Sequence, residues 1–377
     1  MEPILGLQTP AALLEATRFE LNCADMLARV RKLGTRLRPH MKTLKSIEAA
    51  RVAIDPQHGG IAVATLNEAR YFIGNGIRDV CYAVCPSPDK LHAIAELAAT
   101  GCSFFIDTIE LAQRLTGHEA PLHGAPFRVW IEVDCGEHRT GIEPDDAALV
   151  EVARLVEGCP HTELVGVATH AGQSYRCRSI DEIKTVARQE RVAACEAAQR
   201  LRDAGFDIPQ VSIGSSPTAV WTDSTAGITE LRAGVYMAGD LVQSVLGTLP
   251  LDRVAFSVLA TVTSVHPKQH RVIIDAGGLA LSKDRGTSAT VRDYGYGLVL
   301  DAHGNPAYGE LTVTDVHQEH GEILRVPDDV MEKLSLGTKV RVIPNHVCMT
   351  AAMYDRLNVV DSSAGVVTAL WKRTNGW

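Results

Sequence analysis

The sequence has no block of like charges and no long apolar run. Its 377 residues include 37 lysines and arginines against 45 aspartates and glutamates, a formal net charge of −8. A protein that binds nucleic acid or a membrane surface usually gathers basic residues, so this balance argues against both partners. No stretch approaches the ~18 apolar residues of a membrane-spanning helix, and no charged-then-apolar leader opens the chain. We therefore expect a cytoplasmic protein that acts on small molecules.

A disulfide framework is also missing. The nine cysteines are odd in number and mostly lie within apolar strand or helix patterns, and we expect eight of them to be packing residues. Apolar residues are abundant, at 46% against 22% charged residues. This composition predicts one large domain with a sizeable core and a second, smaller domain.

Short apolar segments alternate with helical patterns through the first part of the chain. Thr9-Pro10 opens a helical pattern that we expect to run from Ala11 to Leu33. The eight strands that follow, separated by helices, predict an α/β fold of the (β/α)8 barrel type, in which catalytic groups follow the carboxyl ends of strands. The expected strands are 35–42, 60–65, 79–84, 102–106, 127–134, 163–169, 210–213 and 229–232.

Beyond Leu251 the pattern changes to β-branched runs with turn residues and little helical periodicity. This change predicts a second, mostly antiparallel β domain. We place the boundary near Pro250, so that residues 1–250 form the barrel and residues 251–377 the β domain. The expected strands of the second domain are 254–265, 271–275, 294–300, 310–316 and 339–343.

The first barrel strand ends in a lysine. Pro39 favours extended backbone before it, which places Lys42 at the outlet of this strand. Shielding by the barrel wall and the neighbouring cations Arg38, His40 and Lys45 would lower the pKa of Lys42 towards that of a reactive amine. The pattern is typical of a Schiff-base lysine, and equally of a solvated basic strand end.

Further candidates follow later strands and should meet Lys42 at the same mouth. The loop Gly214-Ser215-Ser216 offers close backbone approach, two hydroxyls and N–H groups where barrels bind phosphate, although such a turn is also an ordinary helix start. Gly234 and Tyr236 lie in the loop after the eighth strand. Together, the two loops predict a cup for a cofactor phosphate.

Three more residues could contact a bound ring. Arg139 lies in a glycine-bounded loop after the fifth strand and could donate to an anionic oxygen, or could be a plain surface arginine. His170 and Tyr175 follow the sixth strand and add an imidazole and a phenol. A lone histidine after a strand is more often structural, so the signal from His170 is the weaker of the two.

A pair of metal ligands follows a strand of the second domain. We expect His346 and Cys348 to share one face of an extended segment, because residues i and i+2 of a strand do so. Nitrogen and sulfur together suit zinc, but a structural zinc would show four ligands. The pair is therefore either chance or an open catalytic site completed by water and substrate. The segment 317–320 could supply polar neighbours.

These stretches, in this order, resemble the D-serine dehydratase and D-threonine aldolase family, whose members are fold-type III pyridoxal-phosphate enzymes. The resemblance extends from Thr9 almost to Trp377. One departure is Leu44, where much of the family has a histidine. The matching stretches are Thr9-Pro10, Arg38-Pro39-His40-Met41-Lys42-Thr43, Thr169-His170, Ser174-Tyr175, 214–218, Gln318-Glu319-His320-Gly321 and Asn345-His346-Val347-Cys348.

The resemblance implies an alanine-racemase-like barrel that carries pyridoxal 5'-phosphate on Lys42, with Tyr175 facing the pyridine nitrogen. It implies that His346 and Cys348 bind a divalent metal, zinc first, with manganese, cobalt or magnesium as alternatives. It also implies a homodimer whose two subunits build each active site.

The activity that the resemblance implies is dehydration of a β-hydroxy-D-amino acid to a 2-oxo acid and ammonia. D-serine, D-threonine and 3-hydroxy-D-aspartate remain open as substrates. The alternative is retro-aldol cleavage to glycine and an aldehyde. Aldolase members tend to carry His-x-Asp at the metal site, so Cys348 favours the dehydratase. A racemase would need no metal pair, and a simple cofactor carrier would need no second domain.

Overall fold

The computed structural model describes residues 2–121 and 124–377 of the chain. Its residues form two compact units. We call Asp25–Gly234 with Thr374–Trp377 the barrel unit, and Met1–Ala24 with Val235–Arg373 the β unit. The chain therefore changes unit between Gly234 and Val235, whereas the sequence pattern placed the change near Pro250. The assignment of residues 1–250 and 251–377 to two functional domains stays a prediction.

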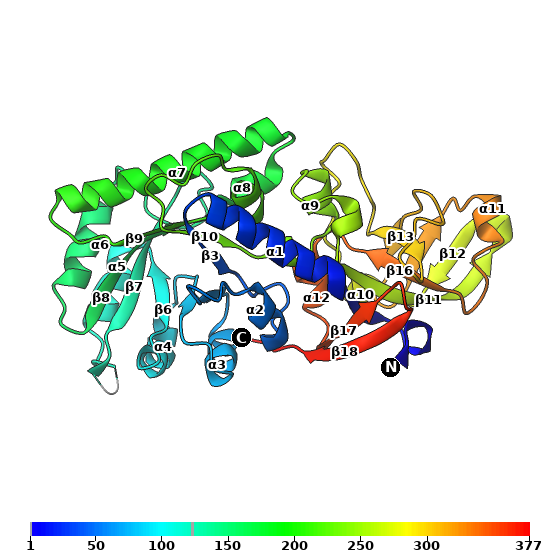
Figure 1. Ribbon diagram of the computed structural model, residues 1–377, viewed down its shortest axis with the longest axis horizontal. Helices are drawn as coiled ribbons and strands as arrows, with labels where there is room; N and C mark the ends of the chain where they lie inside the picture. The colour runs from blue at the N-terminus through cyan, green and yellow to red at the C-terminus, as the bar shows by residue number, and fades with distance from the viewer. Residues whose placement is uncertain (1, 122–123) are drawn as a thin grey trace. The chain divides into compact units, whose positions relative to one another are not determined.

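The barrel unit contains the expected eight parallel strands (Figure 1). They are hydrogen-bonded in the order β3-β10-β9-β8-β7-β6-β5-β4, and a parallel bridge between His40 and Ala62 brings β3 against β4, so that the barrel is nearly closed. The prediction of a (β/α)8 barrel is confirmed. The strands are β3 (Arg36–Pro39), β4 (Ile61–Val63), β5 (Val80–Tyr82), β6 (Ser103–Ile106), β7 (Phe127–Val133), β8 (Thr162–Thr169), β9 (Gln210–Ile213) and β10 (Glu230–Ala233).

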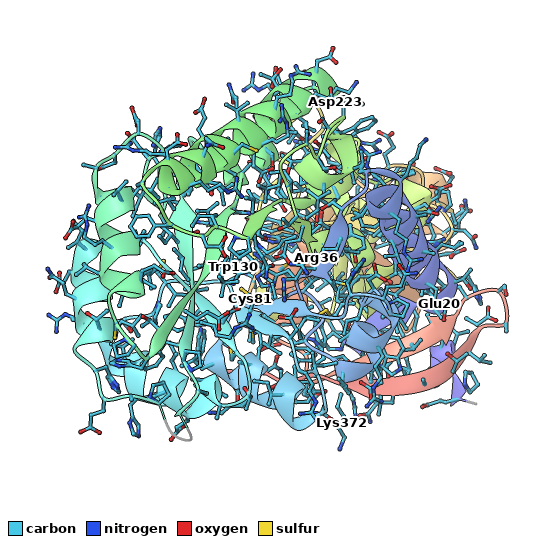
Figure 2. All side chains as sticks on the ribbon, turned by 60° about the vertical axis from the view of Figure 1, so that its left-hand side comes forward. Glu20, Arg36, Cys81, Trp130, Asp223 and Lys372 are labelled. Carbon is cyan, nitrogen blue, oxygen red and sulfur yellow. The ribbon has the colours of Figure 1, made fainter. Side chains whose placement is uncertain are left out.

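Large apolar side chains fill the barrel. Phe105 and Trp130 belong to one buried cluster with Cys81; Trp130 and Cys81 are labelled in Figure 2. The Trp130 indole N–H donates to the Ser103 hydroxyl at 3.1 Å. Strands that are buried on both faces carry continuous apolar runs, and this is why their positions could be predicted.

Helices cover the outside of the barrel, and several begin at side-chain caps. Thr65, Thr108 and Ser179 each accept a hydrogen bond from the backbone N–H three residues later. The longest helix, α7, packs against β8 and β9 (Figure 1). The helices are α1 (Ala16–Lys32), which begins in the β unit, α2 (Ile47–Ala53), α3 (Leu66–Gly74), α4 (Leu91–Ala98), α5 (Ile109–Thr116), α6 (Ala148–Glu157), α7 (Ile180–Asp203) and α8 (Ser216–Trp221).

The β unit is mostly antiparallel, as expected. One path runs β1-β18-β17-β2-β11-β12-β15-β14, with β16 between β11 and β13, and among the described strands of this unit only β17 and β2 pair in parallel. Its strands are β1 (Glu2–Pro3), β2 (Ala11–Glu15), β11 (Phe256–His266), β12 (Arg271–Ile274), β13 (Leu298–Asp301), β14 (Asp315–Val316), β15 (Gly321–Leu324), β16 (Lys339–Ile343), β17 (Arg356–Asp361) and β18 (Val366–Lys372). Its helices are α9 (Leu241–Val245), α10 (Gly278–Leu281), α11 (Asp328–Met331) and α12 (Val347–Ala351).

The expectation of one helix from Ala11 to Leu33 is wrong at its start. Ala11–Glu15 forms β2, which lies between β11 and β17, and the helix begins at Ala16. Residues 11–14 are all buried. A strand buried on both faces has no polar alternation, so its apolar run merges with the pattern of the following helix.

The last residues of the chain belong to the barrel unit. The Thr374 N–H donates to the Lys45 carbonyl at 2.9 Å, and the Asn67 side-chain amide donates to the Asn375 carbonyl at 2.7 Å. The C-terminal tail thus holds the backbone that follows β3. Among the described helices, none combines the length and the apolar composition that crossing a membrane requires.

Candidate active site

Lys42 lies in the turn after β3, which ends at Pro39, whereas the sequence pattern extended this strand to Lys42 itself. The His40 N–H donates to the Ala233 carbonyl of β10 at 2.7 Å, and the Lys42 N–H donates to His40 Nδ1 at 3.3 Å. Met41 and Leu44 on either side are fully buried, but Lys42 itself is exposed. The expectation that the barrel wall shields Lys42 is therefore wrong for this chain alone.

The surroundings of Lys42 are electropositive. Burial lowers the pKa of His40 well below its usual range, and the nearby charges of Lys42 and Arg232 lower it further. The pKa of His170 falls to about 3 through burial and the charges of Lys42, Arg139 and Arg232, despite an opposing hydrogen bond to Gly214. Both imidazoles are thus neutral at pH 7. A mouth with this charge suits an anionic ligand.

His170 and Tyr175 lie together after β8. His170 Nδ1 lies 2.9 Å from the Gly214 carbonyl oxygen, an acceptor, so this nitrogen carries the proton and Nε2 keeps its lone pair. The rings of His170 and Tyr175 are 6.4 Å apart between centroids, at 41°. Tyr175 lies in a 3-10 helix, Gly172–Arg176, and is partly exposed. Sequence reasoning therefore correctly brought these two residues to the same loop.

Glycine is required in both loops of the predicted phosphate cup. Gly214 has φ +135°, and a Cβ there would lie 2.3 Å from the Arg232 carbonyl oxygen. A Cβ at Gly234 would lie 2.7 Å from the His40 carbonyl oxygen. At both glycines the backbone of a neighbouring strand or turn therefore lies too close for a side chain.

The serines of the first loop are fully buried and hold the start of α8. Ser215 is the N-cap, since its hydroxyl accepts from the Thr218 N–H at 3.2 Å, and the Ser215 and Ser174 hydroxyls lie 2.8 Å apart. Ser216 is 1% exposed. The Ser215 hydroxyl, which we predicted for phosphate, thus already has protein partners that fix the shape of the loop.

Arg139 and Tyr236 differ in how firmly they are held. Arg139 is exposed and its guanidinium lies 3.6 Å from the Glu137 carboxylate. Tyr236 is 2% exposed in the β unit, and burial, followed by the charge of Cys23, raises the pKa of its phenol well above the usual range. A phenol held in its neutral form remains a hydrogen-bond donor.

The predicted metal ligands lie in the β unit, but not on a strand. Strand β16 ends at Ile343, His346 caps α12 in an extended conformation, and Cys348 lies in the first turn of α12. The argument from the shared face of a strand is therefore wrong, because Pro344 and Asn345 lead out of the sheet. The helical turn nevertheless brings the two side chains into a hydrogen bond. Both are partly buried.

Acidic groups surround His346. Its Nδ1 lies 2.7 Å from Asp284 Oδ2. Burial alone would lower the pKa of His346, but hydrogen bonds to Asp284 and Cys348 and the charges of Cys348 and Asp240 raise it to about 11. Asp240 is fully buried, burial raises its pKa to about 6, and its Oδ2 accepts from the Val347 N–H at 3.0 Å. A nitrogen and a sulfur beside two carboxylates suit a borderline-soft divalent cation.

Sequence reasoning missed Asp240 and Asp284. Both lie far from His346 in sequence, and nothing in their local pattern marks them. The segment 317–320 contacts α10: the Gly278 N–H donates to the His317 carbonyl at 2.6 Å, and the Leu281 carbonyl of α10 accepts a hydrogen bond from Thr350 of α12. That this segment supplies polar neighbours to His346 and Cys348 stays a prediction.

The described part of the barrel unit also holds two triplets that could bind a cation, neither of which the sequence pattern had indicated. Cys85, Asp107 and Glu132 form one, in which the Cys85 thiol donates to Glu132 at 3.3 Å. Burial, then the charges of Glu132 and Asp107, raises the pKa of this thiol far above its usual range. The other triplet is Asp134, His138 and Glu143.

Comparisons with known proteins agree with this architecture. Residues 15–242 match a family model for the N-terminal domain of alanine racemase, and residues 255–360 match one for a serine dehydratase domain. A D-threo-3-hydroxyaspartate dehydratase of Delftia sp. is 38% identical over the full length of both chains. A D-threonine aldolase of Arthrobacter sp. is 30% identical, covering 98% of this chain and 93% of its own length. A solved D-threo-3-hydroxyaspartate dehydratase, a cysteine-to-alanine mutant in the metal-free form, superposes with a TM-score of 0.94 at 36% identity, with both chains fully covered.

Proposed function

Because the chain belongs to the alanine-racemase-like family of fold-type III enzymes, which use pyridoxal phosphate, we propose that it is an ammonia-lyase that dehydrates a β-hydroxy-D-amino acid. The substrate is 3-hydroxy-D-aspartate in the first place and D-serine in the second. The products are a 2-oxo acid and ammonia. The observation that carries this proposal is the hydrogen-bonded pair of His346 and Cys348, which is a soft ligand set for a metal. The pair lies in a chain that is 38% identical to a D-threo-3-hydroxyaspartate dehydratase.

Lys42 holds pyridoxal phosphate in this proposal. When bound, the cofactor withdraws electrons from the α-carbon of the substrate. Lys42 Nζ, once displaced by the substrate amine, is the base that takes the α-proton. The electropositive mouth around His40 and His170 and the close backbone approach at Gly214 and Gly234 fit an anionic cofactor.

The other residues of the mouth orient the ring. The Tyr175 phenol would face the pyridine nitrogen, and Arg139 would donate to the ring oxygen. His170 stays neutral and positions the Gly214 loop through its Nδ1–H. The loop Gly214-Ser215-Ser216 and the residues Gly234 and Tyr236 would hold the cofactor phosphate.

His346 and Cys348 bind the divalent cation, with zinc as the first choice and manganese, cobalt or magnesium as alternatives. When bound, the cation stabilises the departing β-hydroxyl group as a Lewis acid. Asp284 accepts from His346 Nδ1–H and so directs Nε2 to the cation. We further propose a cytoplasmic homodimer in which two subunits complete each active site.

Retro-aldol cleavage is the second candidate, because the D-threonine aldolase of Arthrobacter sp. matches over nearly the whole chain. Product analysis separates the two activities. The holoenzyme, loaded with zinc or manganese, is incubated in turn with 3-hydroxy-D-aspartate, D-serine and D-threonine. We expect a 2-oxo acid and ammonia in equal amounts. Glycine and an aldehyde as the main products would establish the aldolase instead.

A further inference from the structure

A buried carboxylate joins two loops of the cofactor mouth. Glu190 lies on α7 and is 1% exposed. Its Oε1 accepts two backbone hydrogen bonds, from the Ala171 N–H at 2.9 Å and from the Gly214 N–H at 2.9 Å. Ala171 follows His170 in the loop after β8, and Gly214 opens the loop after β9. One oxygen atom therefore fixes the distance between the two loops.

Two other hydrogen bonds run between the same loops. His170 donates to the Gly214 carbonyl at 2.9 Å, and the Ser174 and Ser215 hydroxyls lie 2.8 Å apart. Both are formed between neutral groups, whereas Glu190 can offer a charged acceptor, and hydrogen bonds to charged groups are roughly twice as strong. Without Glu190, two buried N–H groups would lose their acceptor at once.

The position is an unusual one for an acidic residue. Burial raises the pKa of Glu190 to about 7, although hydrogen bonds from Thr218, Ala171 and Gly214 and the charge of Arg232 act in the opposite direction. A carboxylate so deeply buried is costly to keep unless it has a specific task. An apolar side chain at this place on α7 would fill the space but would accept no hydrogen bond from either loop.

We propose that Glu190 is a positioning residue that sets the spacing of the loops after β8 and β9 and thereby preorganises the phosphate cup of the cofactor site. This inference rests on the proposed function, since it assumes that the cofactor phosphate lies at the Gly214 loop. Glu190 acts from beneath the loops, through backbone N–H groups, and does not touch the reacting atoms.

The test measures pyridoxal phosphate affinity in apoenzyme freed of cofactor by dialysis. Glu190→Leu removes the acceptor, Glu190→Asp withdraws it by one methylene, and Glu190→Gln keeps an oxygen in place. We expect the dissociation constant to rise at least about tenfold in the first two variants, because each leaves buried donors unpaired, and to change less than about threefold in Glu190→Gln.

The matched control is Leu201→Ala, a cavity variant of a fully buried residue on the same helix. It should lower the melting temperature but leave cofactor affinity unchanged. The phosphorus NMR chemical shift of the bound cofactor should change in Glu190→Asp and should equal the wild-type value in Leu201→Ala. If Glu190→Leu does not fold, the dissociation constant and the phosphorus signal of Glu190→Asp test the proposal instead.

The outcomes separate this inference from the proposed function. Wild-type apoenzyme that fails to bind pyridoxal phosphate would overturn the proposed function and the inference together. Wild-type binding with unchanged affinity and phosphorus signal in Glu190→Asp would overturn the inference alone. Weakened binding in Leu201→Ala equal to that in Glu190→Asp would also overturn it, because helix stability would then account for the effect.

Discussion

Two histidines of this chain have opposite electrostatic surroundings. His170, in the barrel mouth, has a pKa lowered to about 3 by burial and by the cations Lys42 and Arg139. His346, in the β unit, has a pKa raised to about 11, because Asp284 and Cys348 outweigh the effect of burial. The charges around His170 thus favour an anion, and the carboxylates beside His346 favour a cation. The proposed ligands of the two sites differ in sign because the neighbours of the two histidines do.

The largest effect should come from Lys42→Ala, which removes both the cofactor anchor and the proposed base. We expect turnover to fall by at least about a thousandfold. Borohydride reduction followed by peptide mapping should place the cofactor on Lys42 in the wild type. Lys45→Arg is the control, since Lys45 forms an ion pair with Glu68 at 3.0 Å. Label on Lys45 instead would refute the assignment of the cofactor to Lys42.

Removing the cation should stop the reaction and spare the barrel mouth. Chelation, or Cys348→Ala, should lower dehydration by about a hundredfold or more, because a Lewis acid contributes several kcal/mol to stabilising the departing oxygen. The absorbance of the bound cofactor should remain. Cys348→Asp should shift preference towards harder ions. Full activity after complete chelation, verified by metal analysis, would show that the reaction requires no cation at His346 and Cys348.

A smaller effect, on metal affinity, is expected when the hydrogen bond that orients His346 is weakened. Asp284→Asn weakens the acceptor at Nδ1, and metal affinity should fall about 10- to 100-fold. The control is Asp293→Asn, which alters a nearby carboxylate that instead pairs with Arg285 at 2.6 Å. Isothermal titration with zinc measures both variants. Equal zinc affinity in wild type and Asp284→Asn would show that His346 orients itself without this partner.

The smallest effect per pH unit or variant concerns the pH dependence of the free energy of unfolding. His170 titrates near pH 6.5 when unfolded but near 3 when folded, so between these values the unfolded chain binds the additional proton. The free energy of unfolding should therefore fall as pH drops from 6.5, by up to about 1.4 kcal/mol per unit. Urea unfolding of the apoenzyme at several pH values should show a shallower dependence in His170→Gln. An unchanged dependence would mean that His170 is not held neutral.

The barrel could be predicted because its strands are buried on both faces and alternate regularly with helices. The rule that functional groups follow strand ends then brought Lys42, His170 and Gly214 to one mouth. The same reasoning failed for Ala11–Glu15, whose partners β11 and β17 lie at the other end of the sequence. Local patterns carry no information about such a distant pairing.

The metal pair was predicted for a reason that the structure does not support. His346 and Cys348 meet through the first turn of α12 and not through a strand. The sequence pattern did not indicate Asp284 or Glu190, because both contact residues that are distant in the sequence. A sequence shows which residues can perform a chemistry, whereas the groups that orient them become visible only in three dimensions.

The C-terminal tail has a consequence for biosynthesis. The Thr374 N–H donates to the Lys45 carbonyl, so the turn that carries Lys42 receives one of its backbone contacts only after residue 374 has been synthesised. The strand β2 likewise waits for β11 and β17 before it can pair. A nascent barrel therefore lacks this backbone contact in the turn after β3 until residue 374 has been added.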